Sequence, residues 1–72
     1  MGQLDAAPGP SVIEALRAIR TERYSMERRE YALIQSARAL GRTWQQIATA
    51  LGQHSPHAAQ QRHKALGRRI GP

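Results

Sequence analysis

The chain has 72 residues and no cysteine, so it can form at most one small domain, with neither disulfides nor a thiolate zinc site to stabilise it. Its net charge is +6, and all five acidic residues precede Tyr31, so the second half of the chain contains no carboxylate side chain. This distribution excludes a carboxylate-based active site in the second half and indicates a surface that binds a polyanion, although a basic surface can also serve solubility alone.

The composition favours helices, because alanine and arginine are common and β-branched residues are few. We predict an all-α fold of three or four helices, in one domain over residues 11–70. No apolar run approaches the ~20 residues that a membrane span requires. The first residues also lack the basic and apolar regions of a signal peptide. We therefore expect a cytoplasmic protein that does not contact the membrane.

Residues 1–10 are predicted to form a disordered lead-in, because small residues there are interrupted by Gly2, Pro8, Gly9 and Pro10. The first helix is predicted to begin at Ser11, which can form a capping box with Glu14. An apolar stripe follows at helical spacing and consists of Val12, Ile13, Leu16 and Ile19.

Two alternatives remain for residues 11–40, because the apolar pattern weakens from residue 20 to residue 30 and yet no Gly or Pro stops a helix. In the first, the helix ends near Arg23, and a second helix runs back from about Met26 to Leu40. In the second, one helix of ~45 Å spans the whole stretch. A single helix would leave the apolar stripe without cover unless a partner supplied it, and for that reason we favour the break.

The second part of this stretch is predicted to face the core through Leu33, Ile34, Ala37 and Leu40, with Tyr31 at the edge. Gly41 ends it. Residues 43–66 then have the pattern of a helix-turn-helix. Thr43 and Gln46 have the form of a capping box at the start of the first helix, and Gly52 follows the last apolar residue. Ser55 is a good N-cap for the second helix, and Pro56 suits its first position.

The inward-facing residues of this segment follow helical spacing: Trp44, Ile47, Ala48 and Leu51, then Ala59, His63 and Leu66, with Ile70 one turn further. The run Trp44, Ile47-Ala48, Leu51 and Ala59-Gln60-Gln61-Arg62-His63 resembles the second half of a Myb/SANT-type repeat. It is also similar to bacterial helix-turn-helix segments with Ile-Ala-x-x-Leu-Gly, and the chain resembles a small actinobacterial regulator. The resemblance implies DNA binding, with the positions of His57 and Gln61 on the groove-reading face.

The candidate DNA-binding residues fall into two groups. The first lies at the start of the helix that follows Gly41, where free backbone N–H groups favour a phosphate: Arg42, Thr43 and Gln45. The second faces outward from the last helix: His57, Gln60, Gln61, Lys64, Arg68 and Arg69. Glutamine suits adenine in the major groove, and Lys or Arg suits guanine or phosphate. A soluble helix face would explain the glutamines equally simply, and capping alone would explain Thr43.

Other chemistries have little support in the sequence. His54, His57 and His63 have no spacing that places two of them four apart on one helical face, so we expect no metal site. No nucleophile has a visible His/Asp partner and no Gly-rich phosphate loop exists, so we expect no enzyme, cofactor or small-molecule substrate. Trp44 is expected to pack in the core rather than on a base. Arg62 can pair with an acidic residue such as Glu30 or reach a phosphate, and the sequence leaves both open.

The sequence therefore predicts a DNA-binding protein, a small transcriptional regulator or a nucleoid-associated factor whose partner is double-stranded DNA. The uncovered stripe near the amino terminus also suggests a homodimer formed through the first helix. One alternative is a protein-interaction module that docks a larger regulator or a polymerase subunit through this helix. Another is a protein that binds structured RNA.

Overall fold

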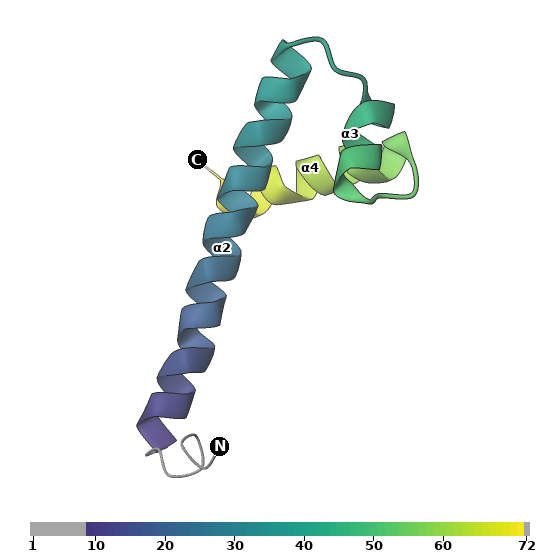
Figure 1. Ribbon diagram of the computed structural model, residues 1–72. Helices are drawn as coiled ribbons and strands as arrows, with labels where there is room; N and C mark the ends of the chain where they lie inside the picture. The colour runs from purple at the N-terminus through teal and green to yellow at the C-terminus, as the bar shows by residue number, and fades with distance from the viewer. Residues whose placement is uncertain (1–8, 72) are drawn as a thin grey trace.

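The computed structural model describes residues 9–71, which form three helices and no strand (Figure 1). These are α2 (Gly9–Ala39), α3 (Trp44–Leu51) and α4 (Pro56–Ile70). The prediction of an all-α fold is confirmed. The predicted lead-in falls mostly on residues 1–8, which lie outside the described residues, whereas Gly9 and Pro10 already belong to α2.

Helix α2 is continuous over 31 residues, so the favoured break near Arg23 is wrong and the single-helix alternative is correct. Ser11 lies inside the first turn of α2 and not at its N-cap. Residues 11–39 contain no Gly or Pro, and this allows the continuity, since the backbone hydrogen bonds of the helix have no interruption there.

Ion pairs explain why the apolar pattern weakens in the middle of α2 although this part of the helix is packed. The Arg62 guanidinium donates two hydrogen bonds of 2.9 Å to the Glu30 carboxylate. Glu27 is buried, and its Oε1 lies 3.1 Å from a guanidinium nitrogen of Arg69. The contact between Arg69 and Glu27 is an ion pair whose geometry is not that of a hydrogen bond. Charged side chains thus hold α4 against a part of α2 that carries few apolar residues.

The turns on either side of α3 follow the predicted capping chemistry. The Thr43 hydroxyl accepts a hydrogen bond from the Gln46 amide at 3.1 Å, and the Thr43 amide donates to the Gln46 side chain at 2.9 Å. Gly52 adopts a φ of 71°, the left-handed conformation that glycine tolerates best. Ser55 accepts from the Ala58 amide and caps α4. These local interactions fix both ends of the turn over residues 52–55.

The core is small and lies where α3 and α4 meet the carboxyl-terminal half of α2. Its buried residues are Ile34, Ile47, Ala48 and Ala59, with Ala37 and Trp44 packed against them, and Leu66 is buried on α4 nearby. Three residues predicted to face the core are exposed, because Leu33, Leu40 and Leu51 keep 63%, 76% and 39% of their surface exposed. Helix α3 covers only the side of α2 that carries Ile34, and Leu33 lies about 100° around the helix from it.

The amino-terminal half of α2 projects away from the core (Figure 1). The described residues extend over 52 × 28 × 18 Å, and the long axis follows α2. The apolar stripe on this half, formed by Val12, Ile13, Leu16 and Ile19, is exposed along its length. Among the helices described, none combines the length and the apolar character that a bilayer crossing demands.

Candidate nucleic-acid interface

One face of α4 consists of polar and basic residues that the fold does not use. Helix α4 packs inward through Ala59 and Leu66, both of which are buried. Residues about half a turn away point in the opposite direction because successive residues rotate by about 100°. This outward face carries five exposed side chains from the predicted set: His57, Gln60, Gln61, Lys64 and Arg68.

Hydrogen bonds and ion pairs leave most of the outward face available. The Nε2 atoms of Gln61 and His57 lie 3.4 Å apart, one helical turn from each other, so these two side chains are positioned together. Within residues 9–71, neither Lys64 nor Arg68 forms an ion pair. The outward face therefore presents two cations and two amides to solvent, beside an imidazole.

The predicted residues at the start of α3 are also exposed, but their side chains differ in availability. The Thr43 hydroxyl is occupied by the cap, as the prediction allowed. The Gln45 amide donates to the Thr49 hydroxyl at 3.3 Å on the same helix. The Arg42 carbonyl accepts a hydrogen bond from the Arg38 guanidinium at 2.8 Å, while the Arg42 side chain is exposed. Arg42 is thus an exposed cation two residues before the first residue of α3.

The two remaining arginines of α4 face α2 rather than the outward side. Arg62 pairs with Glu30, so the first of the two open possibilities for Arg62 is the one observed. The hydrogen bonds that Arg62 donates to Glu30 raise the pKa of Arg62 above its ordinary value, and the charges of Glu30 and Glu27 add to this shift, although partial burial opposes it. Arg69, a predicted DNA contact, pairs with Glu27 and lies apart from the five outward residues.

An aromatic stack sets the position of α4 against the other helices. The His63 ring stacks on Tyr31 of α2 with centroids 4.4 Å apart and meets Trp44 of α3 at 5.8 Å. On the other side, the Arg38 guanidinium lies 5.1 Å from the centre of the Trp44 ring, within range of a cation–π interaction. Burial lowers the pKa of His63 below its ordinary value, although the charge of Glu30 opposes this shift. His63 and Trp44 are packing residues, as the helical spacing predicted.

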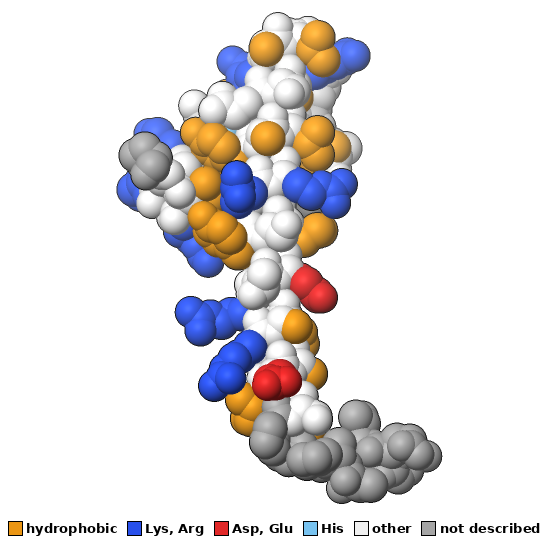
Figure 2. Space-filling model, turned by 90° about the vertical axis from the view of Figure 1, so that its left-hand side faces the viewer, with side chains coloured by type: hydrophobic (Ala, Val, Ile, Leu, Met, Phe, Trp, Pro, Cys, Tyr) orange, Lys and Arg blue, Asp and Glu red, His pale blue; other side chains and the backbone are white. Residues whose placement is uncertain are grey.

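Two surface features were missed in the sequence. The first is a basic groove of about 810 Å³ between the projecting half of α2 and the end of α4, lined by Arg17, Arg20, Thr21, Arg23, Tyr24 and Arg69. Arginine at every third position from residue 17 to residue 23 was the available signal. On the face shown in Figure 2, basic side chains lie along the whole length, while acidic ones appear only on the lower part.

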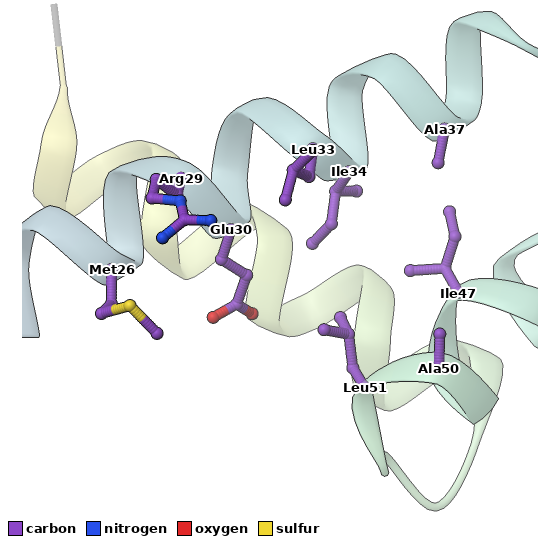
Figure 3. A pocket seen from close by; sticks show the side chains of 9 residues that line it. All are labelled: Met26, Arg29, Glu30, Leu33, Ile34, Ala37, Ile47, Ala50 and Leu51. Atoms are coloured by element: carbon purple, nitrogen blue, oxygen red, sulfur yellow. The ribbon is translucent and has the colours of Figure 1, made fainter.

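The second missed feature is an apolar groove of about 430 Å³ between α2 and α3 (Figure 3). Met26, Leu33 and Ile34 line it from α2, and Ile47 and Leu51 line it from α3. The signal in the sequence was an apolar residue at every seventh position of α2. In residues 9–71, no three His, Asp or Glu side chains gather in a way that could hold a metal ion.

Comparison of the chain with protein-family models, with curated proteins and with solved structures finds no significant match.

Proposed function

We propose that this protein binds double-stranded DNA through a helix-turn-helix over residues 43–66, with α4 as the recognition helix. Two helices joined by a short turn that contains a glycine have the form of this motif. Helix α3 ends at Gly52 and α4 begins after Ser55, so the connection has the required length. The resemblance of the segment to Myb/SANT-type repeats supports the same role, in a small transcriptional regulator or a nucleoid-associated factor.

The sorting of charge on α4 is the observation that carries the proposal. The cations that face α2, Arg62 and Arg69, are neutralised by Glu30 and Glu27. The cations on the opposite face, Lys64 and Arg68, have no such partner within the described residues. Neutralising the inner side of a helix while leaving the outer side positive directs its field toward a polyanion in front of it.

The mechanism divides the outward residues into two roles. Lys64 and Arg68 neutralise phosphates and release counterions, which supplies affinity for any sequence. Gln60 and Gln61 supply amides that can pair with the edge of adenine in the major groove. The start of α3 adds a third contact, because Arg42 and the free N–H groups of its first turn favour a phosphate.

The first experiment is a mobility-shift assay on random duplex DNA over a range of salt concentrations. If about five phosphates are neutralised by each chain, the logarithm of the binding constant should fall with the logarithm of salt at a slope of about −4 to −5. An affinity that does not depend on salt, or no binding at low salt, contradicts the proposal.

The second experiment separates the reading of bases from the holding of phosphates. Gln61→Ala should lower affinity for a selected site by about 1–3 kcal/mol while random DNA is bound almost as before. Arg42→Ala should weaken both duplexes about equally and reduce the salt slope by about 1. Gln35→Ala, on an exposed part of α2, removes the same side chain as Gln61→Ala and should change neither affinity. Equal losses on both duplexes for the Gln61 and Arg42 variants would mean that α4 does not read bases.

A second candidate function is the docking of another protein through the amino-terminal half of α2. The exposed stripe favours it, because contiguous apolar surface of this kind is uncommon on monomers. Two results together would favour this candidate over the first. The parent chain would not bind DNA at low salt, and Leu16→Asp would abolish binding of the chain to a protein partner.

A further inference from the structure

An exposed apolar row runs along the whole of α2. Every seventh residue is apolar and exposed: Val12, Ile19, Met26 and Leu33 in α2, and Leu40 directly after its end. The exposed fraction rises from 43% at Val12 to 76% at Leu40. A strict seven-residue repeat keeps such a row on one side of a helix, where it forms a seam for a second helix. The row is therefore a helix-pairing surface that the chain's own α3 and α4 do not cover.

The two halves of this row differ in shape. Toward the carboxyl-terminal end, Met26 and Leu33 form one wall of the apolar groove, and Leu51 of α3 stands on the other side (Figure 3). Toward the amino-terminal end, Val12 and Leu16 are exposed, on the half of α2 that projects away from α3 and α4 (Figure 1). One end of α2 thus offers a groove, and the other end offers an apolar ridge of the kind that fills a groove.

We propose that two copies of this chain form an antiparallel dimer in which the ridge of each copy, residues 12–19, lies in the α2–α3 groove of the other. A two-fold axis near residues 24 and 25 relates the copies, so the same contact is made twice. In this register Leu16 lies opposite the partner's Leu33, and Val12 lies opposite the partner's Ala37.

The charges on α2 support the antiparallel direction over the parallel one. In a parallel pair, Arg23 would meet the partner's Arg23 and Glu30 would meet the partner's Glu30 inside the seam, and like charges repel there. In the antiparallel register, Glu22 lies across the seam within one turn of the partner's Arg29, a residue that lines the groove. Arg23 comes within one turn of the partner's Glu30, whose carboxylate already accepts two hydrogen bonds from Arg62 of its own chain. The antiparallel pair thus avoids the two like-charge contacts of a parallel pair and adds an opposite-charge contact between Glu22 and the partner's Arg29.

The arrangement of the other helices supports the same direction. Helices α3 and α4 pack against α2 between Glu27 and Arg38, whereas residues 11–26 are exposed throughout. An antiparallel partner places its own α3 and α4 beside the bare half of the first chain. Each copy therefore covers the apolar surface that the other leaves open, and the contact does not require DNA.

The first test is the mass of the full chain without DNA, measured by sedimentation equilibrium at micromolar concentration. A dimer is expected. Leu16→Asp should raise the dissociation constant about 100-fold or more, because two apolar contacts are lost per dimer. Ala18→Asp introduces the same acid on the opposite side of α2 and should leave the dissociation constant nearly unchanged. A monomer mass for the parent chain overturns the proposal, as does an equal effect of both substitutions.

Cysteine cross-linking tests the direction, since the natural chain has no cysteine to interfere. A mixture of Leu16→Cys and Leu33→Cys chains should form disulfide-linked dimers, because the register brings these positions within the ~7 Å between Cα atoms that a disulfide allows. Leu16→Cys alone should not cross-link, because its two copies would lie ~25 Å apart in an antiparallel pair. Cross-linking of Leu16→Cys alone would indicate a parallel pair and overturn the proposal.

A charge exchange provides a variant set that leaves the apolar contacts intact. Glu22→Arg and Arg29→Glu should each weaken the dimer by about 3- to 10-fold, because each places like charges within one turn of one another across the seam at two points. The double variant restores opposite charges and should return the dissociation constant to near its parent value. Losses that add up in the double variant would overturn the proposed register, whatever the DNA-binding assay shows.

Discussion

The two halves of α2 belong to one unbroken helix and yet have different surroundings. Residues 11–26 are all exposed, whereas the following turns bury Glu27 and Ile34 against α3 and α4. Apolar residues occur at the same spacing in both parts, at positions 12, 13, 16 and 19 and at positions 33, 34, 37 and 40, and the first set lies on the half that α3 and α4 do not cover. Helix continuity and helix burial are thus separate properties here. Continuity depends on the absence of helix-breaking residues. Burial depends on which other helices pack against each part of α2.

The comparison implies that the free half of α2 is held by its continuity with the packed half. Isolated helices of this length are marginal in water, because nucleation is costly. The packed half supplies the nucleus, and the free half extends it. Removing the same type of side chain should therefore lower the free energy of unfolding little in the free half of α2 and much more where the helices pack together.

The largest expected effect comes from truncating a leucine at a buried position of α4, the helix that packs against the packed half of α2, and a leucine in the free half of α2. Leu66→Ala removes a side chain that is only 1% exposed and should lower the free energy of unfolding by about 2–5 kcal/mol, which is a large share of the stability of so small a domain. Leu16→Ala removes a side chain that is 57% exposed and should change stability little in dilute solution. Urea unfolding followed by circular dichroism measures both, and similar losses would show that the free half is packed in solution.

A smaller effect is expected where the ion pair joins α2 to α4. Glu30→Gln removes the carboxylate that receives two hydrogen bonds from Arg62. The Arg62 side chain is 42% exposed, so water screens the pair, and the loss should be about 1 kcal/mol. Glu22→Gln, in the free half of α2, is the matched control and should be neutral at low protein concentration. Thermal melts of the two variants make the comparison, and a larger loss for Glu22→Gln would contradict it.

The smallest effect is a pH dependence from His63. Burial lowers the pKa of His63 in the folded chain below the ordinary value of 6.5, so the unfolded chain binds the proton more readily. Above pH 6.5 both states are neutral at this site and no contribution arises. As pH falls below 6.5, stability should decrease, with a slope of at most about 1.4 kcal/mol per pH unit. Melts between pH 7.5 and pH 5.5 should show the slope in the parent chain and in His57→Gln, and a weaker slope in His63→Gln.

Local chemistry was sufficient to predict α3, α4 and the turn between them. The caps of these helices act within a few residues, so they can be predicted without knowledge of tertiary packing. They are formed by Thr43 with Gln46, by Gly52, and by Ser55 with Pro56. Burial of Ile47 and Ala59 followed from helical spacing. The sequence also named Glu30 as a partner for Arg62, without deciding between that pair and a phosphate.

Features that depend on tertiary packing were predicted less well. The sequence favours a break in α2 because a single helix leaves the apolar stripe of residues 12–19 uncovered, and in the structure that stripe is indeed exposed. The weak apolar pattern of residues 20–30 does not end the helix, because Glu27 and Glu30 contact arginines of α4 there. Leu33 and Leu40 are predicted to lie in the core together with Ile34, because all three fall at helical spacing. Only Ile34 is buried, because α3 covers only the side of α2 that carries it. The two grooves join segments that lie far apart in sequence, and the register of these segments is not a local property.

The elongated shape has a hydrodynamic consequence. A rod-like chain of 52 Å in its longest dimension diffuses slowly for its mass of 8.0 kDa, so a gel-filtration column would report too large a molecule even for a monomer. Two such chains lying side by side in opposite directions would double the mass while adding little length. The frictional ratio would then fall on association, and the sedimentation coefficient would rise more steeply with concentration than it does for two spheres that merge.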